Sequence, residues 1–278
     1  MWVDTHCHWD APEFGADAAR CRAQAAAHGV TLCVVPAVAP SNWAAVAQWA
    51  HTHNDVYALG IHPLCAEQAD MNDVLALEQA LSAARNDSRL VAVGEIGLDA
   101  WVPSQRMPPA QAHQRRLFEA QLELARQHDL PVIVHARQAN DLVLAALRRV
   151  GVRRGIAHAF SGSVQQAQAL WAQGLHLGAG GTATFEAARR LHRALAELPP
   201  EAWVMETDAP DIPPQWLYVP RARREAGEAQ GVNSPAQLPR IGHVVAQRLG
   251  LSEIAWRTLS TANAQRALPG LAAWLGNG

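Results

Sequence analysis

Two histidines one residue apart stand in the first apolar run of the chain. The segment WVDTHCHWD, residues 2–10, contains His6 and His8 beside an aspartate. Side chains two residues apart on a strand point to the same face, so both imidazoles would face one way and Cys7 the other. Such a pair could bind a metal ion, or it could be two polar side chains near a strand end. The short motif alone does not decide between these interpretations.

Ionisable side chains recur at the ends of later apolar runs. Together with the first pair they make four imidazoles and two carboxylates. Burying so many ionisable groups without a compensating charge is costly, and divalent cations supply that compensation. The pattern therefore predicts a metal site. The later residues are Glu95 in GEIGLD, His135 in VIVHAR, His158 in IAHAFSGS and Asp208 in METDAP.

The number of candidate ligands favours two metals over one. A catalytic zinc takes about three protein ligands and keeps a position open for water. Two cations roughly 3.5–4 Å apart can share a carboxylate and activate the water that attacks a substrate. Glu95 is the natural bridge, because the chain has no lysine that could be carboxylated for this purpose. Mixed imidazole and carboxylate ligation leaves Zn²⁺, Mg²⁺ and Mn²⁺ open.

These residues need a fold that gathers strand ends from the whole chain. Short apolar runs alternate with Ala/Leu-rich stretches at helical spacing, which indicates βα units around a parallel sheet. Eight strands in 278 residues predict an α/β protein with a (β/α)₈ TIM barrel, whose active site forms at the carboxyl ends of the strands. The alternative is a doubly wound open sheet, but its GxGxxG fingerprint does not follow the first strand. The predicted strands are Trp2–His8, Thr31–Val38, Val56–His62, Leu90–Leu98, Pro131–Ala136, Gly155–Phe160, His176–Gly180 and Trp203–Thr207.

The remaining segments fit a single domain over residues 1–278. A long loop is predicted at about residues 209–235, where prolines, glycines and charges replace the periodic pattern. Helices are predicted over Gln111–His128, with Phe118, Leu122 and Ala125 as a buried stripe, and over Pro235–Leu249 and Ser252–Leu268.

Composition narrows the class of function. The chain is 49% hydrophobic, has a net charge of −2 and contains no apolar run of membrane-spanning length, which predicts a soluble protein without a long basic groove. All 23 Lys+Arg residues are arginine, which excludes Schiff-base and P-loop lysine chemistry. The four cysteines form no CxxC pair, and the chain begins almost directly in a strand; we therefore expect reduced thiols and a cytoplasmic protein.

The motifs VDTHCH, GIHP, VGEIGLD, PVIVHAR, HAFSGS, ETDAP and NSP, in this order, resemble the TatD family of metal-dependent deoxyribonucleases, and its YjjV-like branch in particular. The likeness extends from Val3 to Asn263. It implies a TIM-barrel hydrolase that cleaves phosphodiester bonds of DNA, as a 3′-5′ exonuclease on single strands or 3′ ends. It also implies two divalent cations per subunit, one held by His6, His8, Glu95 and Asp208 and the other by Glu95, His135 and His158.

Other residues receive roles at the same strand ends. Asp208 would also take a proton from the attacking water, and with Glu95 it completes the predicted catalytic pair. Arg137, two residues after His135, would bind a phosphate oxygen through its planar fork, or it is a surface arginine. His62 in GIHP could contact the substrate or orient a ligand, although a hydrogen-bonded core histidine explains it nearly as well.

Some candidates carry less weight. His51 and His53 form a second HxH pair, but they follow a helical pattern and are expected to be solvated. Arg221, Arg223 and Arg224 could attract phosphates or form a solvated surface. Four aromatic residues could stack on bases or pack in the core: Trp9, Trp101, Phe160 and Trp216.

Three functions remain open. The first is the DNase, expected to be a monomer with no obligate protein partner and no membrane association. The second is a hydrolase of small lactones, amides or phosphate esters, because a fold does not fix the substrate. The third is a metal-binding barrel without catalytic activity.

Overall fold

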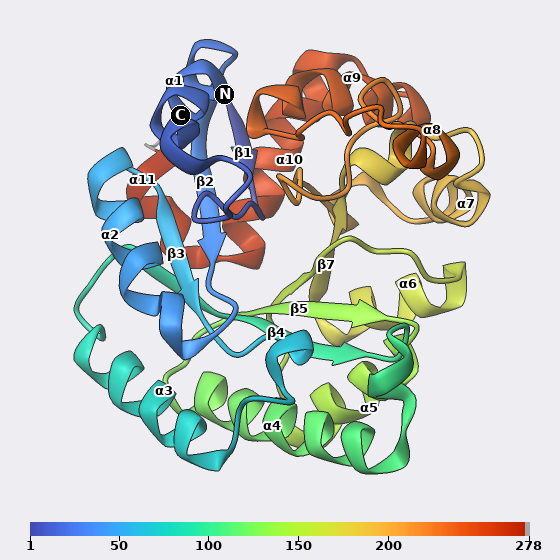
Figure 1. Ribbon diagram of the computed structural model, residues 1–278. Coiled ribbons are helices and arrows are strands. Elements are labelled where there is room, and N and C mark those ends of the chain that lie inside the picture. The colour runs from blue at the N-terminus through green and yellow to red at the C-terminus, as the bar shows by residue number, and fades with distance from the viewer. Residues whose placement is uncertain (276–278) are drawn as a thin grey trace.

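A parallel barrel of eight strands forms the centre of the molecule (Figure 1). The computed structural model describes residues 1–275, and each strand in them pairs in parallel with the next one along the chain. Two contacts connect the last strand to the first. The Thr5 amide donates to the Met205 carbonyl at 3.0 Å, and the backbones of Cys7 and Ala209 form an isolated parallel β-bridge. The (β/α)₈ prediction is confirmed. The strands are β1 (Trp2–Asp4), β2 (Val30–Pro36), β3 (Val56–Leu59), β4 (Leu90–Asp99), β5 (Val132–Arg137), β6 (Gly155–Ala157), β7 (Leu175–Ala179) and β8 (Trp203–Met205).

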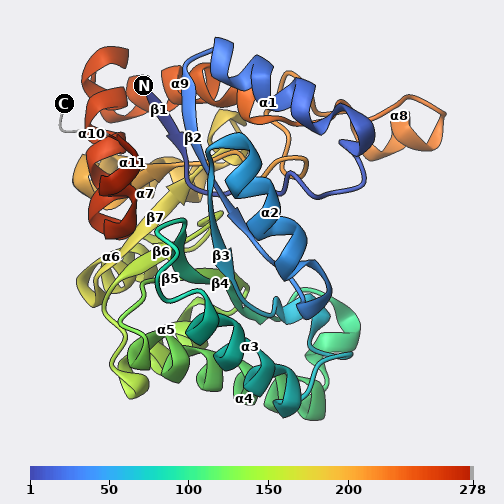
Figure 2. The ribbon, with the colours of Figure 1, turned by 90° about the vertical axis from the view of Figure 1, so that its left-hand side faces the viewer.

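Helices surround the barrel, and one follows each of the first seven strands (Figure 2). α4 begins three residues before its predicted start, because prolines are favoured in a first helical turn. Within residues 1–275, none of the helices combines the length and apolar character that crossing a membrane requires. The helices are α1 (Ala18–Ala27), α2 (Trp43–His53), α3 (Met71–Ala83), α4 (Pro108–Gln127), α5 (Asn140–Val150), α6 (Val164–Gln173), α7 (Arg189–Glu197), α8 (Arg221–Glu225), α9 (Leu238–Leu249), α10 (Glu253–Ala267) and α11 (Ala272–Leu275).

The core has two parts. The predicted α4 stripe of Phe118, Leu122 and Ala125 is fully buried between the helices and the outside of the sheet. A second cluster joins strand residues to the C-terminal segment that follows α10, including Leu268 and Leu271. The strand members of that cluster are Val3, Leu32, Val34, Val56, Ala58, Val91, Ala92, Ile133, Ile156 and Val204.

Several strands end earlier than the sequence predicts. β1 ends at Asp4 and β8 at Met205, so the polar residues that follow lie in irregular segments beyond the ladder. Ala159 and Asp208 have φ angles of 45° and 55°, which are incompatible with a strand. The ligand candidates therefore belong to strand-end loops, except Glu95 in β4 and His135 in β5.

The predicted loop after β8 contains one short helix, α8, which was not predicted from the sequence. The Asn233 side chain fixes the loop by donating to the Thr207 and Asp211 carbonyls at 2.9 and 2.7 Å. Arg221 and Arg223 form exposed ion pairs with Glu225 and Glu228. These arginines are thus part of a solvated surface.

The buried imidazole of His176 in β7 should make stability depend on pH. It is 6% exposed, packs edge-on against Trp171 and has no hydrogen-bond partner in the part of the chain described. Burial, aided by Arg266, lowers its pKa to about 4. In the unfolded chain the imidazole binds its proton near pH 6.5. The stabilisation that comes from keeping His176 neutral in the fold is therefore fully present above pH 6.5 and is lost as the pH falls to about 4.

His176→Leu should therefore flatten the acid side of the stability curve. Urea unfolding should be measured at several pH values. Between pH 7 and pH 4, the free energy of unfolding of the wild type should fall by about 3 kcal/mol more than that of the variant. Parallel curves for the two proteins would show that His176 titrates normally in the fold.

Candidate metal centre

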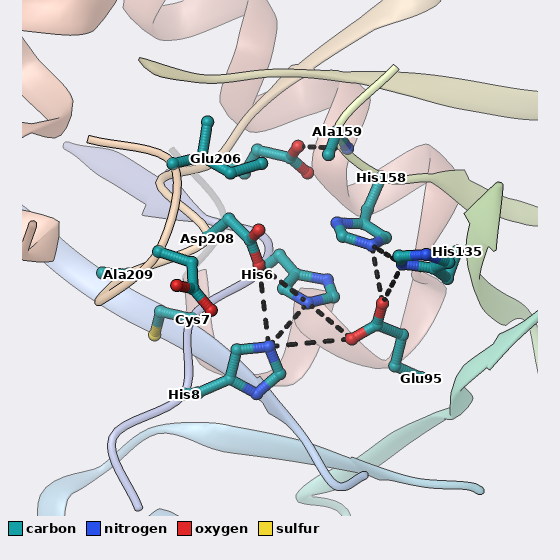
Figure 3. A network of polar contacts seen from close by, with 12 residues as sticks. His6, Cys7, His8, Glu95, His135, His158, Ala159, Glu206, Asp208 and Ala209 are labelled. Atoms are coloured by element: carbon teal, nitrogen blue, oxygen red, sulfur yellow. Dashed lines mark hydrogen bonds and ion pairs between the residues drawn. The ribbon is translucent and has the colours of Figure 1, made fainter. Parts of the chain in front are cut away.

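The six predicted ligands come together at one end of the barrel (Figure 3). All of them line or adjoin one cavity of about 770 Å³ at the carboxyl ends of the strands. His6 is fully buried and Glu95 is 2% exposed. Side chains from β4 and β5 and from the segments that follow β1, β6 and β8 approach one another closely, which agrees with the prediction that strand ends build the site.

One oxygen of Glu95 faces the first histidine pair. Glu95 Oε2 lies 3.1 Å from His6 Nε2 and 3.6 Å from His8 Nε2. These two nitrogens are 3.1 Å apart, and Asp208 Oδ1 lies 3.5 and 3.6 Å from them. Three donor atoms therefore gather on the side of the carboxylate that Oε2 faces. His6 and His8 face the same way, as predicted, but β1 ends before them, so strand alternation is not the reason.

The other oxygen of Glu95 faces a separate set of imidazoles. Glu95 Oε1 lies 2.6 Å from His158 Nε2, 2.9 Å from His135 Nδ1 and 3.1 Å from His62 Nε2. His62 Nδ1 accepts the Leu64 backbone N–H, so a neutral His62 carries its proton on Nε2 and donates to Glu95. His62 therefore contacts Glu95 directly, which agrees with a role in orienting a ligand.

A glycine allows β4 and β5 to bring Glu95 and His135 together. Gly97 has a φ of 153°, a conformation that other residues rarely adopt, and a Cβ at this position would collide with the His135 carbonyl. Glycine therefore permits the close backbone approach that this part of the site needs.

The carboxylates and imidazoles shift one another's pKa. Burial would raise the pKa of Glu95, but His158, His62 and His6 hold it well below its usual range. Burial together with His158 lowers the pKa of His6 to about 4, which favours the neutral form that ligates metals. Against the effect of burial, Glu95 raises the pKa of His158 to about 10. The protonation of each of these groups therefore depends on the charge of the others. Their nitrogen and oxygen atoms suit a divalent cation.

Asp99 is a further site residue, not predicted from the sequence. Its Oδ2 lies 3.0 Å from His135 Nε2, while Oδ1 accepts the backbone N–H groups of Trp101 and Val102. These hydrogen bonds, His135 first, outweigh burial and lower the pKa of Asp99 to about 2, so it stays ionised. Asp99 follows Glu95 by four residues on the same strand, and this even spacing was the available signal.

Two further buried acids support the site from behind. Asp4 accepts the His6 amide at 3.2 Å and both the amide and hydroxyl of Thr207, which ties the ends of β1 and β8 together. Glu206 accepts the Ala159 amide at 2.5 Å, next to His158. Burial raises the pKa of Asp4 to about 7 and that of Glu206 to about 8. Neither role was predicted from the sequence.

The structure separates the weaker candidates. Arg137 is exposed at the cavity rim, with its guanidinium carbon 4.9 Å from the centre of the Trp101 ring. Trp9 and Phe160 are 1% and 3% exposed, so core packing is the correct one of the two alternatives for them. Trp216 packs under Arg240.

The second HxH pair ends α2, away from the centre, as expected. His51 is exposed and pairs with Asp87, as a solvated side chain should, but His53 is half-buried against Trp49, so the expectation that it is solvated is wrong.

A parallel barrel with imidazoles and carboxylates clustered at its strand ends has the architecture of a metal-dependent hydrolase. Comparison with known proteins agrees. Residues 3–269 match the family described as TatD related DNase. The chain is 40% identical over 214 residues to the Escherichia coli "uncharacterized metal-dependent hydrolase YjjV", covering 76% of this chain and 80% of that protein.

The similarity extends to other relatives and to structure. The crystal structure of E. coli YjjV, a TatD homologue, superposes with a TM-score of 0.86 at 33% identity, covering 96% of this chain and 98% of that one. A zebrafish protein named "putative deoxyribonuclease tatdn3" is 28% identical over 76% of this chain and 80% of its own length. The chain belongs to the TatD family of metal-dependent hydrolases.

Asp99→Asn should weaken divalent metal binding by about 10- to 100-fold, because it removes the charged partner that orients His135. Calorimetric titration with Mn²⁺ and Zn²⁺ measures the effect. Asp17→Asn, which alters only an exposed pair with Arg20, is the control. Equal metal affinities for both variants would show that Asp99 is not needed for His135 to bind the metal.

Proposed function

We propose that the protein is a deoxyribonuclease that cleaves DNA phosphodiester bonds from a 3′ end with two divalent cations. The observation that carries this proposal is the orientation of Glu95, whose two oxygens face two separate donor sets at the floor of an open cavity. His6, His8 and Asp208 would hold one cation beside Oε2. His135 and His158 would hold the other beside Oε1. Zn²⁺, Mg²⁺ and Mn²⁺ all fit this donor set.

When bound, the cations would offset phosphate charge and make a water molecule more nucleophilic. Asp208 lines the cavity and faces His6 and His8 with Oδ1, which leaves its second oxygen to accept the proton of the attacking water. Arg137 would bind a phosphate oxygen at the cavity rim, as its planar fork suits. His62 would hold Glu95 in place and contact the substrate from the same wall.

The DNA substrate is supported by the family description and by the name of the zebrafish relative. One observation favours a second candidate, a hydrolase of small lactones, amides or phosphate esters. Asp10, Glu13 and Asp211 line part of the cavity, and these acids would repel a long polyanion that crossed them. A DNA strand must therefore approach from the side of Arg137.

Purified protein with Mn²⁺ or Mg²⁺ should shorten a 5′-labelled single-stranded oligonucleotide stepwise, and EDTA should abolish the reaction. Asp208→Ala should reduce the rate by about 10²–10⁴-fold, without rescue by added metal, because a ligand and proton acceptor is lost. Asp129→Ala, an exposed carboxylate, should behave as wild type.

The outcomes separate the candidates. Turnover of a lactone, amide or phosphate-ester panel with intact oligonucleotides would favour the second function. Full metal occupancy without any turnover would indicate a catalytically inactive metal-binding barrel.

We also infer that the chain acts as one domain, as a monomer and in the cytoplasm, without an obligate protein partner or membrane association. The four free cysteines support the reducing compartment. Light scattering coupled to size exclusion tests the oligomeric state.

A further inference from the structure

A second cavity opens beside the metal centre. It has a volume of about 590 Å³ and shares the lining residues Arg137 and Ser161 with the first cavity, so the two cavities adjoin at these residues. Its other walls come from the start of α5, the segment after β6 and Arg190 in α7. The residues assigned to metal binding are not among those that line it.

The walls of this second cavity suit a nucleotide. Trp101 and Leu142 line the cavity, are 46% and 41% exposed, and offer apolar surface to a base. The guanidinium carbons of Arg137 and Arg106 lie 4.9 and 5.9 Å from the centre of the Trp101 ring, so a base would contact the part of the indole that they leave exposed. An aromatic face stacks on any base, so such contacts tolerate sequence. The Trp101 backbone is fixed by its hydrogen bond to Asp99 at 2.7 Å, which holds the start of the loop that carries the indole.

Charge distinguishes the two directions away from the metal centre. Arg190 lines the second cavity and Arg137 lies where the two cavities adjoin, whereas Asp10, Glu13 and Asp211 line only the first. The second cavity contains one acid, Asp141, whose Oδ1 accepts the Gln166 amide at 3.1 Å. A chain of phosphates is attracted towards the arginines and repelled from the opposite acids.

We propose that the second cavity binds the nucleotide next to the one whose phosphodiester reaches the metal centre. Its base lies against Trp101 and Leu142, and a backbone phosphate faces Arg190. Arg137, at the junction, contacts the phosphate between the two nucleotides. This proposal rests on the proposed function and deepens it: the preferred substrate is an oligonucleotide strand, and a dinucleotide or smaller phosphate ester is a poor one.

The test is the dependence of kcat/KM on substrate length. Single-stranded oligonucleotides of two, three, four and six residues are assayed with wild type, Trp101→Ala and Arg190→Ala. Wild type should gain about 5- to 100-fold once the substrate is long enough to fill the second cavity, the range expected for stacking one base. Each variant should lose most of that gain, mainly through a higher KM.

Two matched controls keep the test specific. Trp101→Phe should retain most of the gain because it preserves an aromatic face. Arg193→Ala, in the same helix as Arg190 but outside the cavity, should behave as wild type.

Equal kcat/KM at all lengths in wild type, or equal losses at all lengths in the variants, would overturn this proposal alone. Failure to cleave DNA of any length would overturn the proposed function together with it.

Discussion

The buried carboxylate of Glu95 is the constraint on which the site depends. Burial alone would favour its neutral form, yet imidazoles from four other segments surround it and keep it ionised. The negative charge of a carboxylate in this position can be offset by protons on the neighbouring imidazoles or by cations bound between the groups. Because each oxygen faces its own donors, we propose that Glu95 would bridge two cations.

The rest of the fold holds the groups around this carboxylate. Asp4 joins the ends of β1 and β8, so His6 and Asp208 stay adjacent although about 200 residues separate them. Asp99 orients His135 from the side away from Glu95, and Gly97 lets the two strands approach closely enough. Such supporting groups act on ligand geometry and therefore on metal affinity.

Much of this arrangement could be predicted from the sequence, because parallel strands in a barrel send their carboxyl ends to one face. That rule placed all six ligand candidates together without knowledge of their distances. It could not identify Asp4, which precedes the strand-end loops and whose role depends on Thr207 in another segment. Asp99 ends β4, so the rule could have placed it at the site but not its hydrogen bond to His135. Nor could the rule separate the buried Trp9 from the exposed Trp101, since burial of an aromatic depends on neighbouring helices. The shape and charge of the cavities arise from loops, for which periodicity gives no prediction.

The most direct test is a crystal structure of the protein grown with Mn²⁺, with anomalous scattering recorded at the barrel mouth. The account predicts two peaks, one on each side of Glu95, the first beside His6, His8 and Asp208 and the second beside His135 and His158. A single peak that leaves one oxygen of Glu95 without a metal would contradict the bridging role, and the absence of any peak would remove the basis for a two-metal hydrolase.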